Sequence, residues 1–138
     1  RATYDGPIAA LNAVKDSGRE TDYRVLPRAV FSVPTLAAVG LTESEALARG
    51  HQIRVGKAQA VGGRSNALGD TRGMLKVILE EDTNVILGFH ILAPHADDLI
   101  HEAVVAMHDH GTIERISKSI HVHPTLSELV KSVAKAAR

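Results

Sequence analysis

The chain has 138 residues, of which 44% are hydrophobic and 23% are charged, and this balance is typical of a folded globular domain. Its 16 basic and 16 acidic residues cancel, so it lacks the basic excess of nucleic-acid-binding proteins. It contains no cysteine, which excludes disulfides and thiolate chemistry within this stretch. No apolar run reaches the roughly 18 residues that span a bilayer, and no signal peptide opens the sequence. We therefore expect a soluble, cytoplasmic protein with neither nucleic acid nor a membrane as its partner.

The first 26 residues predict a short helix followed by a polar linker. Residues 7–17 carry apolar side chains at helical spacing behind Pro7, and Gly18 ends the pattern. The next residues are polar and lead to Pro27. Because the first residue is Arg1 rather than methionine, we expect the chain to be a piece of a longer protein.

The middle of the chain predicts strands and one short helix. An apolar stretch at residues 29–33, interrupted by Pro34, is typical of an edge strand. Residues 42–49 predict a helix with a capping box, because Thr42 and Glu45 stand three positions apart. A further strand and a hairpin with a polar four-residue loop are expected at residues 53–61, 73–80 and 85–92.

The last third of the chain predicts helices. Apolar side chains recur at helical spacing in three segments, which are residues 97–107, 113–120 and 126–137. Strands come first and helices follow, so the fold class is α+β, with an antiparallel sheet packed against helices.

Histidine is the unusual residue of the second half, which holds seven of the eight. Imidazole is a good ligand for zinc or nickel, so a stand-alone histidine-rich metal-binding module is one alternative. The nearest spacing to a metalloprotease motif begins at His101-Glu102 but has Val105 where the second histidine is needed. His121 and His123 would share a face only in an extended segment. We assign no metal ligand.

The segment from His123 to Glu128 has a definite local geometry. Pro124 disfavours the helical conformation at His123, and Thr125 is the expected N-cap of the last helix, with Glu128 three positions on. Two interpretations are open. Glu128 only caps the helix, or it also reaches back to the imidazole of His123, fixes its tautomer and makes it an acid–base group.

The same residues carry a resemblance to a known family. The run His123-Pro124-Thr125-Leu126-Ser127-Glu128 resembles the H-P-T-x-S-E signature of the pyridine nucleotide–disulfide oxidoreductases, the group that contains dihydrolipoamide dehydrogenase and glutathione reductase. Four earlier segments resemble, in the right order, the first strand, the turn and the central hairpin of that family's dimerisation domain. They are residues 27–34, 39–43, 73–77 and 86–92.

The resemblance implies a division of the chain and a role for the signature. Residues 1–26 would be the tail of a preceding FAD domain with its linker, and residues 27–138 the dimerisation domain of a homodimer. His123 would act as the acid–base group in the partner subunit's active site, oriented by Glu128, and the main chain at His123 and Pro124 would contact the partner's flavin.

The cofactors are expected to lie outside this chain. It has no G-x-G-x-x-G turn and no P-loop, so a self-contained dinucleotide site is not expected. The resemblance implies that FAD and NAD(P) would be bound mainly by N-terminal domains that also hold the redox cysteines. The fragment alone is therefore expected to be inactive. A pure assembly module, in which Glu128 serves only as a cap, is the remaining alternative.

Overall fold

The computed structural model describes residues 1–137 and contains five strands and six helices in that range. The strands are β1 (Arg28–Val30), β2 (Thr35–Gly40), β3 (Ile53–Gln59), β4 (Met74–Glu80) and β5 (Ile86–Ala93). The helices are α1 (Ala2–Lys15), α2 (Glu43–Ala48), α3 (Gly63–Leu68), α4 (Ala96–His108), α5 (Ile113–Ser117) and α6 (Ser127–Ala136).

The strands form one antiparallel sheet in the order β1-β2-β5-β4-β3. The predicted hairpin is its centre, where β4 pairs with β5 and Val77 lies opposite Phe89. The predicted edge strand is β1, which occupies one margin of the sheet as the nearby proline requires. The α+β class with an antiparallel sheet is thus confirmed.

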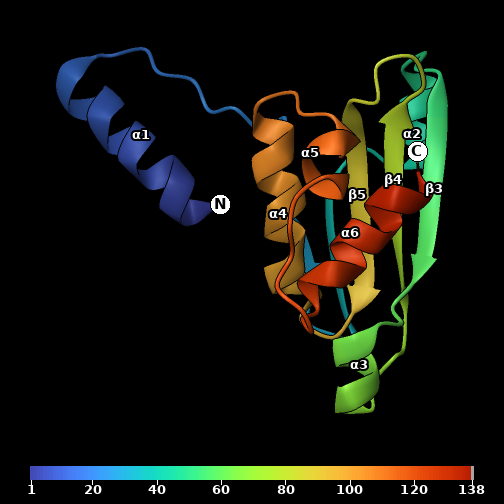
Figure 1. Ribbon diagram of the computed structural model, residues 1–138. Coiled ribbons are helices and arrows are strands. Elements are labelled where there is room, and N and C mark those ends of the chain that lie inside the picture. The colour runs from blue at the N-terminus through green and yellow to red at the C-terminus, as the bar shows by residue number, and fades with distance from the viewer. Residues whose placement is uncertain (138) are drawn as a thin grey trace.

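Helices α4, α5 and α6 cover one face of the sheet, as Figure 1 shows. Helix α4 packs against β2 and β5, while α6 packs against β3 and β4. Alternate strand residues such as Leu75, Val77 and Phe89 are fully buried and meet Ile100 and Leu129 in a single core. Each such side chain contributes about 1.5–3 kcal/mol through its removal from water. The core therefore fixes α4 and α6 on the same face of the sheet.

The sequence did not predict β2 and α3. Strand β2 follows Pro34 at once and is built of small residues, so the proline concealed its start and the alternation was weak. Helix α3 has only six residues and just one buried side chain, Ser65, and therefore shows no apolar stripe. Ile120, predicted to belong to the 113–120 helix, lies beyond the end of α5 and is almost fully exposed.

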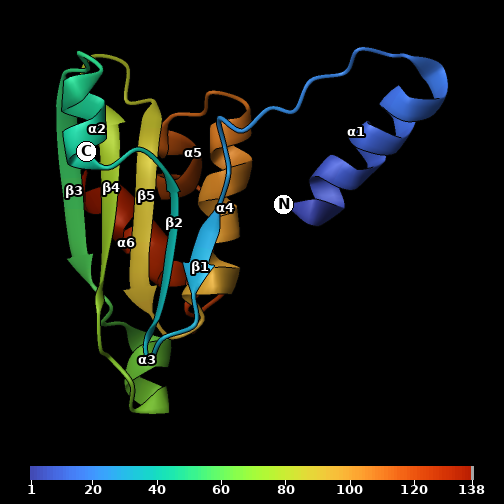
Figure 2. The ribbon, with the colours of Figure 1, turned by 180° about the vertical axis from the view of Figure 1, so that it is seen from behind.

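Helix α1 stands apart from the sheet and its helices, as both ribbon views show (Figures 1 and 2). It begins at Ala2, before the predicted start at Pro7, and has no buried residue. No helix within residues 1–137 is long and apolar enough to cross a membrane.

Candidate functional site

The predicted site lies in the connection between α5 and α6, at one end of the sheet. The same end carries α3 and the turn between β1 and β2 (Figure 2). Helix α3 touches the site directly, because a Cβ atom added at Gly63 would lie 3.3 Å from Cε1 of His123. The imidazole is therefore bounded on one side by the start of α3.

His123 and Glu128 are in contact. The Nδ1 atom of His123 lies 3.0 Å from Oε1 and 3.2 Å from Oε2 of Glu128. The imidazole side chain is 74% exposed, whereas the glutamate side chain is 30% exposed. An ionised carboxylate only accepts hydrogen bonds, so Nδ1 is the donor and Nε2 is left available to exchange a proton. The geometry brings the two predicted site residues together, and their chemical role stays a prediction.

Glu128 also caps the chain entering α6. The backbone N–H of Thr125 donates to Oε2 of Glu128 at 3.0 Å. This bond first, and the contact with His123 second, hold the pKa of Glu128 below its ordinary value. The predicted capping box is only half formed. The Thr125 hydroxyl donates to the carbonyl of Val122 at 2.7 Å, and the N-cap residue of α6 is Leu126.

Sequence reasoning missed a second histidine–glutamate pair in the same loop. Nε2 of His121 lies 2.9 Å from Oε1 of Glu102 in α4, and Nδ1 lies 3.2 Å from the carbonyl oxygen of Ser119. The side chain of His121 is only 7% exposed. His121 and His123 therefore do not share a face. Within residues 1–137, no group of three or more histidine, cysteine or acidic side chains is placed to hold a metal ion.

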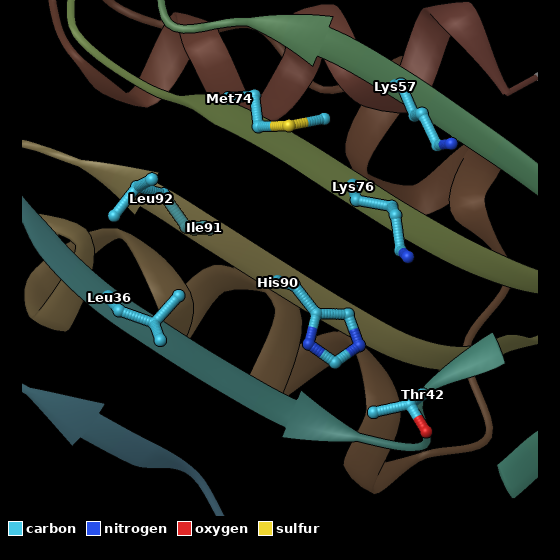
Figure 3. Close-up of a pocket in the computed structure, with 8 residues that line it drawn as sticks. All are labelled: Leu36, Thr42, Lys57, Met74, Lys76, His90, Ile91 and Leu92. Carbon is cyan, nitrogen blue, oxygen red and sulfur yellow. The ribbon is translucent and has the colours of Figure 1, made fainter. Parts of the chain in front are cut away.

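A groove of about 460 Å³ lies elsewhere, on the face of the sheet that α4 and α6 leave open (Figure 3). An apolar row from three neighbouring strands, Leu36, Leu92 and Met74, forms one part of it. Lys57, Lys76 and His90 form a second, basic row beside it. Burial lowers the pKa of His90. Neither His123 nor Glu128 lines this groove, so it is separate from the candidate site.

The chain does not fit a dinucleotide cofactor by itself. A dinucleotide site needs a glycine-rich turn that opens a helix long enough to present its N-terminus to the pyrophosphate. The nearest feature in residues 1–137 is the Gly62-Gly63 pair before α3, and there the Gly62 N–H is already bonded to the Ser65 hydroxyl at 2.8 Å. FAD and NAD(P) would thus need residues outside this chain.

Comparison with known proteins agrees with the fold and the signature. Residues 26–134 match the family described as the pyridine nucleotide-disulphide oxidoreductase dimerisation domain. The chain belongs to this family. The matched range includes the whole sheet and the segment from His123 to Glu128.

Relatives extend over nearly the whole chain. It is 38% identical over 137 residues to leghemoglobin reductase of Vigna unguiculata and 36% identical over 137 residues to dihydrolipoyl dehydrogenase of Bacillus subtilis. These alignments cover 99% of this chain but 26% and 29% of the two relatives. Among solved structures, the HOCl-induced flavoprotein disulfide reductase RclA from Escherichia coli matches with a TM-score of 0.88 and 26% identity, over 97% of this chain and 32% of that one.

The family membership has two direct consequences, and the alignments add a third fact. The family is one of FAD- and NAD(P)-dependent oxidoreductases, and a domain of this kind implies a homodimer in the family. The chain spans only about a quarter to a third of the length of the relatives named here.

Proposed function

We propose that this chain is the dimerisation domain of a flavin-dependent NAD(P)H:disulfide oxidoreductase of the dihydrolipoamide dehydrogenase type. In this proposal it supplies His123 and Glu128 to the active site of the partner subunit. The carrying observation is that His123 is largely exposed while Glu128 holds its Nδ1 atom. This arrangement leaves Nε2 free for a proton that comes from a second molecule or subunit.

The surroundings of His123 support the delivery of its ring to a second protein surface. Several exposed large apolar side chains lie on the elements next to His123. They are Val30, Phe31 and Val33 in and beside the β1–β2 turn, Val61 and Leu68 just before and at the end of α3, and Val122 beside His123 itself. Apolar surface of this extent is typical of protein–protein interfaces. A second subunit docked there would place its own site next to the imidazole.

The chemistry assigned to His123 is proton transfer with sulfur. A thiol has an ordinary pKa of about 8.5 and is mostly protonated at neutral pH, whereas an imidazole titrates near pH 6.5. Nε2 of His123 accepts the proton of a substrate thiol as the resulting thiolate attacks a disulfide sulfur, and the displaced sulfur leaves as a thiolate. Glu128 keeps Nδ1 protonated, so Nε2 remains the acceptor. FAD and NAD(P), held mainly by other domains, supply the electron transfer.

The division of the chain follows the same proposal. Helix α1 buries none of its residues against the sheet, which supports the assignment of residues 1–26 to the tail and linker of a preceding FAD domain. Residues 27–138 would then form the dimerisation domain. His123 and Pro124, at the exposed end, would contact the partner's flavin through the main chain.

The test is the His123→Ala variant in the intact flavoprotein. Loss of a general acid–base group lowers dithiol turnover by roughly 10² to 10⁴. His51 offers a matched control, because its ring pairs with Glu80 at the opposite end of the sheet. His51→Ala should retain normal turnover. Normal turnover in His123→Ala would remove the catalytic assignment.

A further inference from the structure

His123 lies in the connection between α5 and α6, and this connection contains no helix or strand. Residues 118–126 lie between Ser117, the last residue of α5, and Ser127, the first residue of α6. A segment of this kind needs side-chain contacts to hold one conformation. Two histidines provide them at alternate positions, since His121 is nearly buried and His123 is largely exposed.

His121 holds the beginning of this loop against α4. Its two ring nitrogens meet the carboxylate of Glu102 at 2.9 Å and the carbonyl of Ser119 at 3.2 Å. A carboxylate and a carbonyl are both hydrogen-bond acceptors, so each ring nitrogen of His121 faces an acceptor on a different element.

A second contact holds the same point against α6. Nζ of Lys131 donates to the carbonyl of Ser119, the oxygen that also accepts from His121. The loop is thus tied at Ser119 and His121 to α4 and α6, the two helices that the core fixes on the same face of the sheet. Only Val122 separates this anchor from His123.

From these contacts we propose that His121 is a positioning residue for His123. Its pairing with Glu102 fixes the start of the loop, while Glu128 fixes the imidazole from the other side. The proposal rests on the proposed function, because it concerns how His123 is presented. A displacement of about 1 Å in a reacting group can cost on the order of 100-fold in rate. The anchor therefore acts on turnover through His123 and not by touching substrate.

The experiment is a double-mutant cycle in the intact flavoprotein. His121→Ala should lower kcat by about 10- to 100-fold with little change in KM, because the ring is misplaced and substrate binding is not. His121→Gln, which keeps a donor near the position of Nε2, should recover most of that loss. In the His123→Ala background, His121→Ala should cause no further loss, since the group that it positions is already gone.

Two further variants keep the result decisive if His121→Ala folds poorly. Glu102→Gln keeps an acceptor for the ring and should retain the fold, with a smaller loss of kcat. A crystal structure of this variant should show residues 119–123 less ordered than in the wild type. His51→Ala, which removes a histidine–glutamate pair outside the loop, should leave kcat unchanged.

The outcomes separate the positioning role from the proposed function. Losses of kcat that multiply in the double variant, or that disappear once kcat is referred to the folded, flavin-containing protein, would overturn the positioning role and leave His121 a purely structural residue. A kcat within twofold of the wild type in His121→Ala would overturn it as well. Normal turnover in His123→Ala alone would instead overturn the proposed function, and the positioning role with it.

Discussion

The two histidine–glutamate pairs of the α5–α6 loop use the same chemical groups in different surroundings. His121 and Glu102 are 19 positions apart in the chain and meet at 2.9 Å, and the ring is almost fully buried. His123 and Glu128 meet at 3.0 Å within five positions, and the ring is open to solvent. Exposure therefore decides what each pair can do. A buried ring with both nitrogens bonded holds the chain, whereas an exposed ring with one free nitrogen can exchange protons.

The largest difference between the pairs is expected in stability. Glu102→Ala leaves the buried ring of His121 without its acceptor, and an unsatisfied buried polar group costs about 1–3 kcal/mol. Glu128→Ala should destabilise less, because water can replace the lost contact of His123. Urea titration followed by circular dichroism measures both losses. Equal losses in the two variants would contradict the assignment of different roles.

The contact of His123 with Glu128 should affect how the stability of the protein depends on pH at acid pH. Hydrogen bonds from Thr125 and His123 lower the pKa of Glu128 below its ordinary value of 4.5, so the folded chain binds this proton less readily than the unfolded chain. The stabilisation that the ionised Glu128 contributes is complete at pH values above the pKa of this carboxyl in the unfolded chain. It is lost as the pH falls through its lower pKa in the folded chain.

The variant that tests this is Glu128→Gln, which cannot titrate. The stability difference between the wild type and this variant should be constant near neutral pH and should shrink as the pH falls below 4.5. Chemical denaturation at a series of pH values measures it. A difference that stays constant across that range would show that the contacts do not favour the ionised carboxylate.

The smallest effect is expected from Gly63→Ala. The new methyl group would lie 3.3 Å from Cε1 of His123, so the ring must shift by a few tenths of an ångström. We expect kcat to fall by several-fold at most, while stability does not fall, since alanine favours a helical position by about 1 kcal/mol over glycine. Steady-state kinetics and thermal unfolding check the two parts. An unchanged kcat would mean that the ring tolerates displacement.

The contacts that the sequence could predict are the local ones. The capping box of Thr42 and Glu45 and the central hairpin follow from spacing and alternation, and both are present. The contact of Glu128 with His123 is one of the two interpretations that the helix start left open. The contact of His121 with Glu102 could not be predicted, because it depends on how α4 packs beside the loop. The sequence around His121 and His123 does not indicate which residue His121 contacts.

The N-cap of α6 shows a finer limit. Thr125 had the residue type and the spacing of a cap, but its hydroxyl donates to the carbonyl of Val122 instead. A threonine hydroxyl has several backbone partners within reach, and the loop conformation selects among them. Spacing alone left the roles of His123 and Glu128 open. Their proposed roles as acid–base group and orienting carboxylate come from the family resemblance.

Subunit complementation tests the central claim most directly. His123→Ala and a variant in the redox cysteines, which we expect upstream of this domain, are each made in the intact protein and then co-expressed. If His123 acts in the partner's active site, each mixed dimer contains one site with both functional groups, and the mixture regains about a quarter of the wild-type activity. If the histidine serves its own subunit's site, the mixed dimers hold no complete site, and a mixture as inactive as its two parents would contradict the account.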